Sequence, residues 1–148
     1  MNKPRCILVD IDGTLADTSH RIHHLNKTPK DWENWNGSME KDEPKTIIVE
    51  IVKLLAEKDI AVLLVTGRFE AHRKKTLKWL LKHNIPFNAM YMRKNGDFRS
   101  DHIIKQEIFR ETIQPMFDTI AAFEDRKSVV DMWREAGLVC LQVAEGDF

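Results

Sequence analysis

Residues 7–14, with the sequence ILVDIDGT, decide the fold that we expect for this chain. The stretch passes from an apolar run directly into two aspartates, Asp10 and Asp12, and then into Gly13. A short run of branched apolar residues is typical of a strand that is buried on both faces. The stretch therefore predicts a buried first strand whose carboxyl end carries two carboxylates.

Four further apolar runs resemble the first, and helical patterns lie between them. The predicted strands cover residues 6–11, 60–65, 87–92, 119–123 and 139–143. Apolar residues recur at helical spacing across 47–55, 77–81, 103–113 and 129–133, before the stop signal Gly137. Such alternation predicts parallel strands joined by right-handed crossovers. We expect an α/β fold: a Rossmann-like, doubly wound parallel sheet of about five strands, in the order 3-2-1-4-5.

The 148 residues fit a single domain, 1–148, with one irregular insert. Residues 17–42 break the alternation and carry three His and two Trp, which predicts a small cap or lid. Trp32 and Trp35 fit two interpretations, a stack for a nucleobase or the core of the cap. His20 and His24 would share a helical face, but no third ligand follows at a suitable spacing. We therefore expect these histidines to face solvent or substrate rather than zinc.

Composition excludes several classes of protein. The chain has 23 basic and 23 acidic residues, so no global charge marks it as a binder of nucleic acid or of anionic membranes. It shows neither a signal-peptide pattern nor a run of about 20 apolar residues, which predicts a cytoplasmic protein without a membrane partner. Cys6 and Cys140 lie in apolar runs and are expected to be reduced core thiols. Whether the chain forms a homo-oligomer stays open.

The two acids of the opening stretch need a cation or hydrogen-bond donors between them, because adjacent carboxylates resist ionising together. In doubly wound sheets, ligands bind beyond the carboxyl ends of the strands, which is where Asp10 and Asp12 are expected. Mg²⁺ suits the position, since it takes oxygen ligands and keeps waters and a substrate phosphate. Gly13 permits a sharp exit from the strand and leaves backbone NH groups free to face an anion.

Three further motifs follow DIDGT at residues 10–14. They are VTGR at 65–68, the run RSDHIIK ending at Lys105, and FEDR at 123–126. In this order the set resembles the haloacid dehalogenase (HAD) superfamily of phosphatases. Met92, Arg93 and the ending 129–148 extend the resemblance to the 3′-phosphatase domain of phage-type polynucleotide kinase-phosphatases.

The resemblance implies roles for the motif residues. Asp10 would attack the phosphoryl group and form an aspartyl-phosphate, and Asp12 would donate and later accept a proton. Thr66, the NH of Gly67 and Lys105 would hold the phosphate. Residues matched to further essential positions of the family are Arg21, Arg68 and Asp101.

The resemblance also implies a Mg²⁺ site. Its expected ligands are the carboxylate of Asp10, the backbone carbonyl of Asp12 and the carboxylate of Asp125. Glu124 would lie nearby or act through water. The family usually has Asp at this last position, so Glu124 departs from the pattern.

The function expected from this resemblance is a Mg²⁺-dependent phosphomonoesterase that removes 3′-phosphates from DNA or RNA ends, in nucleic acid repair, or from a small nucleotide. The alternatives are a nucleotidase or small-metabolite phosphatase of the same superfamily and, outside enzymes, a receiver-type signalling module phosphorylated on Asp. The chain has no GxxxxGK[ST] motif, so kinase activity is not expected. The basic run at 72–75 is typical of a solvated helix face, and its functional alternative is a track for a nucleic-acid backbone.

Overall fold

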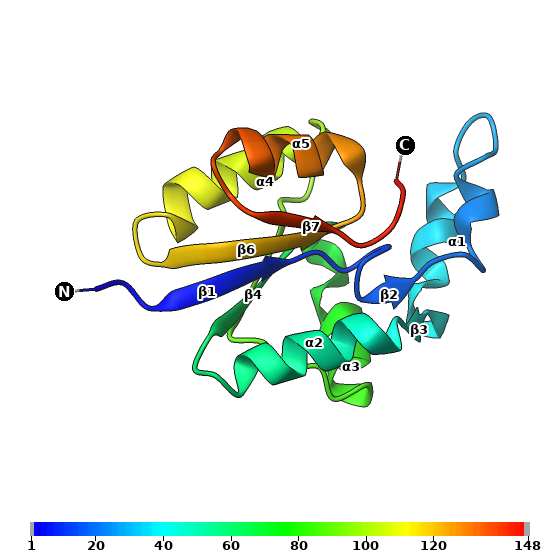
Figure 1. Cartoon of the computed structure of the whole chain (residues 1–148). Coiled ribbons are helices and arrows are strands. Elements are labelled where there is room, and N and C mark those ends of the chain that lie inside the picture. The colour runs from blue at the N-terminus through cyan, green and yellow to red at the C-terminus, as the bar shows by residue number, and fades with distance from the viewer. Residues whose placement is uncertain (1, 147–148) are drawn as a thin grey trace.

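Five parallel strands form the central sheet of the computed structural model, which describes residues 2–146 (Figure 1). Their spatial order is β5-β4-β1-β6-β7, which is 3-2-1-4-5 when the five strands are numbered along the chain. Both the α/β fold and the predicted strand order are therefore confirmed. The bounds are Arg5–Val9 (β1), Ala61–Phe69 (β4), Ala89–Arg93 (β5), Asp118–Glu124 (β6) and Cys140–Gln142 (β7).

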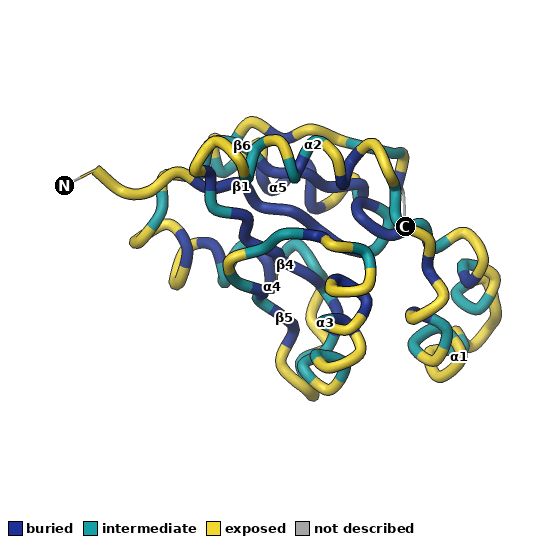
Figure 2. Tube along the Cα trace, turned by 90° about the horizontal axis from the view of Figure 1, so that it is seen from below, coloured by how far each residue is buried: buried dark blue, intermediate teal, exposed yellow. Residues whose placement is uncertain are grey.

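Helices cover both faces of the sheet, so successive strand residues are all buried. Ile7 and Val9 belong to the apolar core beneath two helices, whereas Cys6 and Leu8 belong to the core beneath the other two (Figures 1 and 2). Burial on both faces explains why the strands are continuous apolar runs rather than alternating ones. One pair of helices is α2 (Thr46–Ala56) with α3 (Arg73–Lys82), and the other is α4 (Asp101–Ile108) with α5 (Lys127–Glu135).

Several element boundaries differ from the prediction: for example, β1 ends at Val9 instead of residue 11, and α3 begins at Arg73 instead of residue 77. The predicted second strand ends at residue 65, but β4 runs on to Phe69, because pairing with β5 resumes at Phe69 and Arg93 after an irregularity. The predicted third helix is α4 followed by a π-helical turn at Phe109–Ile113. Because of this extension, the VTGR motif lies within β4, at the carboxyl end of the strand.

The segment between β1 and α2 stands outside the main sheet, beyond the carboxyl end of β1 (Figures 1 and 2). Its ends pair as a short antiparallel ribbon of β2 (Ala16–Asp17) and β3 (Glu43–Pro44). Between these strands lie α1 (Trp32–Gly37) and short 3-10 helices at Ile22–His24 and Met39–Lys41. This ribbon encloses the predicted insert, 17–42; that it acts as a cap remains a prediction.

Three smaller expectations concern the rest of the chain. Cys6 and Cys140 are buried and free, as expected for core thiols. None of the helices in the described part of the chain has both the length and the apolar composition that a bilayer crossing demands. Asp147 and Phe148, which belong to the ending that carries part of the family resemblance, lie outside the described residues.

Candidate active site

The predicted site residues meet at the carboxyl edge of the sheet. Asp10 directly follows β1, Thr66 lies in the extended end of β4, and Glu124 is the last residue of β6. Parallel strands end at one edge, so residues far apart in sequence become neighbours there. Lys105 reaches the same place from α4, where its side chain is buried.

Three carboxylates form what we call the acidic cluster: Asp10, Glu124 and Asp125. One oxygen from each lies within 4.8 Å of the others, and all three residues are buried. The Nζ of Lys105 donates to Asp10 Oδ1 at 2.9 Å and to Glu124 Oε2 at 2.8 Å. The hydroxyl of Thr14 lies 3.3 Å from Asp10 Oδ2 and 3.3 Å from Asp125 Oδ1. The ammonium group of Lys105 thus contacts two of the three buried carboxylates.

The pKa values of the three carboxyl groups reflect the excess of carboxylates over positive charge in the cluster. Burial, reinforced by Glu124, raises the pKa of Asp10 to about 7. Burial and the charge of Asp10 raise the pKa of Asp125 to about 6. Burial also raises the pKa of Glu124, although Lys105 opposes the change. Carboxylates that resist ionisation until a further positive charge arrives are a fitting donor set for a hard divalent cation.

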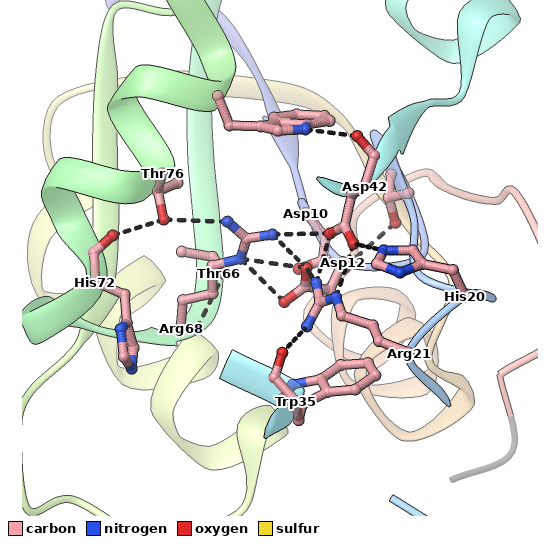
Figure 3. A network of polar contacts seen from close by, with 12 residues as sticks. Asp10, Asp12, His20, Arg21, Trp35, Asp42, Thr66, Arg68, His72 and Thr76 are labelled. Atoms are coloured by element: carbon pink, nitrogen blue, oxygen red, sulfur yellow. Dashed lines mark hydrogen bonds and ion pairs between the residues drawn. The ribbon is translucent and has the colours of Figure 1, made fainter. Parts of the chain in front are cut away.

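A second group, which we call the arginine cluster, surrounds Asp12 (Figure 3). Arg21 Nη2 donates to Asp12 Oδ1 at 2.7 Å, and Arg68 Nη2 donates to the same oxygen at 2.6 Å. Arg21 also forms a bidentate pair with Asp42, through Nε to Oδ1 at 2.7 Å and Nη2 to Oδ2 at 2.6 Å. Two guanidinium groups and two carboxylates therefore balance one another without any added ion.

Asp42 is a functional candidate that the sequence patterns did not indicate. Its carboxylate is fully buried and also contacts Nε2 of His20 at 2.6 Å and Nη2 of Arg68 at 3.4 Å. Its backbone carbonyl accepts a hydrogen bond from Nε1 of Trp79 at 2.8 Å, which ties the insert to α3. Asp42 ends the irregular insert, where no periodicity or motif distinguishes it from the neighbouring Lys41 and Glu43.

The arginines hold Asp12 in its charged form. Burial acts to raise the pKa of Asp12, but Arg68 and Arg21 outweigh it and keep that pKa well below its usual range. The expected division of labour requires a proton donor at Asp12 and a charged nucleophile at Asp10. The charges of the described residues alone split the two pKa values in the opposite sense, since the pKa of Asp10 is raised and that of Asp12 is lowered.

Asp101 and Gly67 belong to a third set of contacts next to the acidic cluster. Asp101 pairs with Arg93 and, at 3.0 Å, with Nη1 of Arg126. Arg93 Nε donates to the carbonyl of Gly67 at 2.9 Å. A Cβ on Gly67 would lie 2.6 Å from Asp101 Oδ1, so this close approach requires glycine. The contacts fix the end of β4 that follows Thr66, whose hydroxyl accepts a hydrogen bond from the NH of Arg68 at 3.1 Å.

Gly13 is needed for a similar reason at the acidic cluster. Its φ is +83°, and a Cβ there would lie 2.0 Å from Asp125 Oδ2. A side chain at this position would be strained and would also displace a carboxylate of the cluster.

The insert contributes side chains that support the arginines. The ring of Trp35 lies 3.9 Å from the guanidinium carbon of Arg21, and its carbonyl accepts from Arg21 Nη1 at 3.2 Å. Trp32 is half exposed. His20 bonds to Asp42 rather than to a histidine neighbour, and within residues 2–146 the acidic cluster is the one group with metal-ligand geometry.

Comparison with known proteins places the chain in a family. Residues 4–148 match the family model described as "Polynucleotide kinase PNKP phosphatase domain". The chain belongs to this phosphatase-domain family. The predicted class, a phosphoric monoester hydrolase of the HAD superfamily, is thereby confirmed.

The relatives of this phosphatase domain are larger proteins. A protein of Autographa californica nuclear polyhedrosis virus, named as a bifunctional polynucleotide kinase/RNA ligase, is 30% identical over 134 residues, which cover 89% of this chain and 18% of the viral protein. Two solved chains, from a Pnkp1/Rnl/Hen1 complex and a Pnkp1/Rnl/Hen1 RNA repair complex, are 33% identical with TM-scores of 0.86 and 0.87. Each covers 99% of this chain, which spans 48% and 44% of theirs. The chain thus spans less than half of each of these relatives.

The fold is shared more widely than the sequence. The class C acid phosphatase of Bacillus anthracis has a TM-score of 0.71 at 16% identity, over 99% of this chain and 70% of that one. This likeness supports the fold alone.

Proposed function

We propose that the chain is a Mg²⁺-dependent phosphomonoesterase that works through an aspartyl-phosphate and removes 3′-phosphates from polynucleotide ends. The observation that carries the proposal is the pairing of two clusters at one strand end. The acidic cluster has one lysine for three carboxylates, and the arginine cluster surrounds Asp12, two residues after Asp10. A phosphate monoester bound between them would meet a nucleophile on one side and guanidinium groups on the other.

In the proposed reaction, a carboxylate oxygen of Asp10 attacks phosphorus while the bond from phosphorus to the leaving 3′ oxygen breaks. The cycle requires Asp12 to carry a proton in the complex with substrate: it donates that proton to the leaving oxygen, then accepts one from the water that attacks the aspartyl-phosphate, so both residues return to the forms they had in that complex. Lys105 would neutralise charge on Asp10 and on the transferring group. Arg21 and Arg68 would orient Asp12 toward the leaving oxygen.

The metal is expected at the acidic cluster. Asp10 and Asp125 would hold Mg²⁺ by their carboxylates and Asp12 by its backbone carbonyl, with Glu124 close by. When bound, the ion would supply positive charge to the phosphoryl oxygens and favour the ionised form of Asp10. The carboxylate of Asp12 lies outside the three-residue cluster, which agrees with a backbone contribution from that residue.

Two observations support a polynucleotide 3′-phosphate as the substrate. The family model is that of a polynucleotide kinase phosphatase domain, and similar chains occur in an RNA repair complex. A nucleotidase or small-metabolite phosphatase would use the same two clusters, so the substrate panel below separates them. A receiver-type module is disfavoured, because the chain carries a second carboxylate held by two arginines beside the nucleophile.

The test is phosphate release from a 3′-phosphorylated oligonucleotide, a 3′-mononucleotide, a 5′-mononucleotide and a sugar phosphate, with and without Mg²⁺. We expect the oligonucleotide to have the highest kcat/KM and chelation to abolish its turnover. Asp10→Asn should lower kcat by at least about 10⁴-fold, because it removes the nucleophile. Asp118→Asn, at the opposite edge of the sheet, is the matched control. Turnover of the 5′-mononucleotide alone would refute the 3′-phosphate assignment in favour of a nucleotidase. An active Asp10→Asn variant would refute the mechanism.

A further inference from the structure

Helix α3 carries a row of lysines that the proposed catalytic steps do not use. Lys74, Lys78 and Lys82 are spaced four residues apart, so they lie along one side of the helix, and Lys75 is beside them. All four are exposed. We call them the lysine stripe. From Lys74 to Lys82 the stripe is about 12 Å long, at 1.5 Å per residue.

The stripe is unusual because nothing on its own helix neutralises it. Residues 71–83 contain no acidic residue, in a chain whose total charge is zero. None of the four lysines forms an ion pair with a described residue. Like charges four residues apart destabilise a helix by about 0.2–0.5 kcal/mol per pair. The protein thus carries a small stability cost at this face.

Other surface helices avoid that cost. In α5, Lys127 pairs with Asp131 at 2.7 Å, four residues on. In α2, Lys53 pairs with Glu50 at 3.8 Å. In α2 and α5 a lysine thus has a carboxylate partner one turn away on its own helix, which the lysines of α3 lack.

The stripe also begins beside the arginine cluster. Arg68 Nη1 donates to the hydroxyl of Thr76 at 3.1 Å, and that hydroxyl donates to the carbonyl of His72 at 2.9 Å (Figure 3). The first turn of α3 is thus bonded to a residue of the candidate site. Buried Thr76, Trp79 and Leu80 face the protein, so the lysines of the stripe face outward.

We propose that the lysine stripe binds the phosphate backbone of a single-stranded polynucleotide, upstream of the 3′ end held in the site. This inference rests on the proposed function for the identity of that end. A row of unpaired lysines binds phosphates by releasing condensed counterions, without reading sequence. Binding through the stripe would favour long substrates over mononucleotides, because only a longer strand reaches both the site and the helix.

The test compares two double variants that remove the same charge. Lys74→Gln/Lys78→Gln removes two of the four lysines of the stripe. Lys53→Gln/Lys58→Gln removes one lysine from α2 and one from the loop that follows it, at the opposite edge of the sheet. We expect the stripe variant to raise KM for a 3′-phosphorylated oligonucleotide by about tenfold at low salt. The slope of log KM against log salt should fall in magnitude by about 1.4, or 0.7 for each lost contact. KM and kcat for a 3′-mononucleotide should not change.

Glutamine is a good helix former, and the substitution removes like-charge repulsion, so Tm of the stripe variant should not fall. An unchanged oligonucleotide KM, or an equal rise in the control variant, would overturn the proposal. Binding of a 3′-hydroxyl oligonucleotide, measured by fluorescence anisotropy, separates this inference from the proposed function. Stripe-dependent binding without phosphate release would refute the 3′-phosphatase assignment alone, whereas turnover of mononucleotides without oligonucleotide binding would refute the stripe alone.

Discussion

Asp10 and Asp12 leave the same strand two residues apart, yet they enter opposite electrostatic environments. Asp10 shares the acidic cluster with two other carboxylates and one lysine. Asp12 shares the arginine cluster with two guanidinium groups and the carboxylate of Asp42. One cluster has an excess of negative charge, and the other is balanced by the protein's own residues.

This difference shows which of the two clusters has its charges balanced by the residues of the protein alone. The arginine cluster satisfies its charges by internal pairing, so its geometry is set on folding. The acidic cluster keeps two carboxylates with raised pKa values, so protons or a cation must supply what Lys105 alone does not. Perturbations of the two clusters should therefore respond differently to metal and to pH.

The largest effect is expected from Lys105→Gln, which removes the only cation of the acidic cluster among the described residues. Breaking a buried ion pair from one side typically costs about 3–5 kcal/mol of unfolding free energy. We expect a loss of this size at pH 8 without metal, measured by denaturant unfolding. Mg²⁺ should recover part of it, because the ion would compensate the same carboxylates. Lys58→Gln is the control, and equal stability of the two variants would contradict the account of the cluster.

The next effect is the pH dependence of the metal-free protein. A carboxyl whose pKa is higher in the folded than in the unfolded chain stabilises the fold fully below its ordinary value of 3.8 and loses that contribution as the pH rises through the folded pKa. For Asp125 and Asp10 these values are about 6 and about 7. Stability should therefore fall between pH 5 and pH 8, by about 4 kcal/mol when both carboxyls titrate, and stabilisation by Mg²⁺ should grow over the same range.

The arginine cluster should not contribute to the change in stability between pH 5 and pH 8. The pKa of Asp12 is lowered, so its contribution is present above 3.8 and is lost only in stronger acid. Thermal unfolding from pH 5 to pH 8 can check the contrast: Glu124→Gln should flatten the profile, and Asp42→Asn should leave its slope unchanged. A flattened profile in Asp42→Asn would show that the two clusters are coupled more strongly than their contacts indicate.

Asp42→Asn should lower the unfolding free energy by about 2 kcal/mol, which is less than the loss expected for Lys105→Gln. The amide keeps one acceptor oxygen, and both arginines still pair with Asp12. Its effect on catalysis should depend on the leaving group. Displaced arginines would misorient Asp12, so kcat should fall about 10- to 100-fold for an alkyl phosphate and much less for p-nitrophenyl phosphate, whose leaving group needs little protonation. Asp31→Asn, which alters the N-cap of α1 within the same insert, is the control. Equal losses on both substrates would indicate a general structural defect instead.

The family resemblance indicated the members of the acidic cluster, and the strand pattern explains why they meet, because each of them directly follows or ends a strand. Short apolar runs locate the strands, and parallel strands deliver their carboxyl ends to one edge. The distant Asp10 and Asp125 could thus be assigned to one place before any coordinates were known. Lys105 required the family resemblance, since a lysine on a helix is ordinarily solvated.

The arginine cluster was only partly predictable. The resemblance indicated Arg21 and Arg68, but not that both would pair with Asp12 and Asp42. Asp42 lies 21 residues from Arg21 and 26 from Arg68. The insert between β1 and α2 has no strand or helix periodicity that would fix its path, so its end could not be placed beside the site. Pairing of β4 with β5 beyond residue 65 depends likewise on tertiary contacts.

The smallest effect is expected from Thr14→Val, which tests how much of the acidic cluster depends on neutral hydrogen bonds. The hydroxyl has one proton and lies 3.3 Å from oxygens of both Asp10 and Asp125, so it serves one of them at a time. Its removal should lower the unfolding free energy by about 1 kcal/mol without metal. With saturating Mg²⁺ the loss should shrink, because an ion held by both carboxylates would replace that contact. Thr112→Val, on an exposed helical turn, is the control. A loss that grows with Mg²⁺ would mean that the hydroxyl positions the carboxylates for the ion, and the cluster would then be prearranged for metal rather than merely short of positive charge.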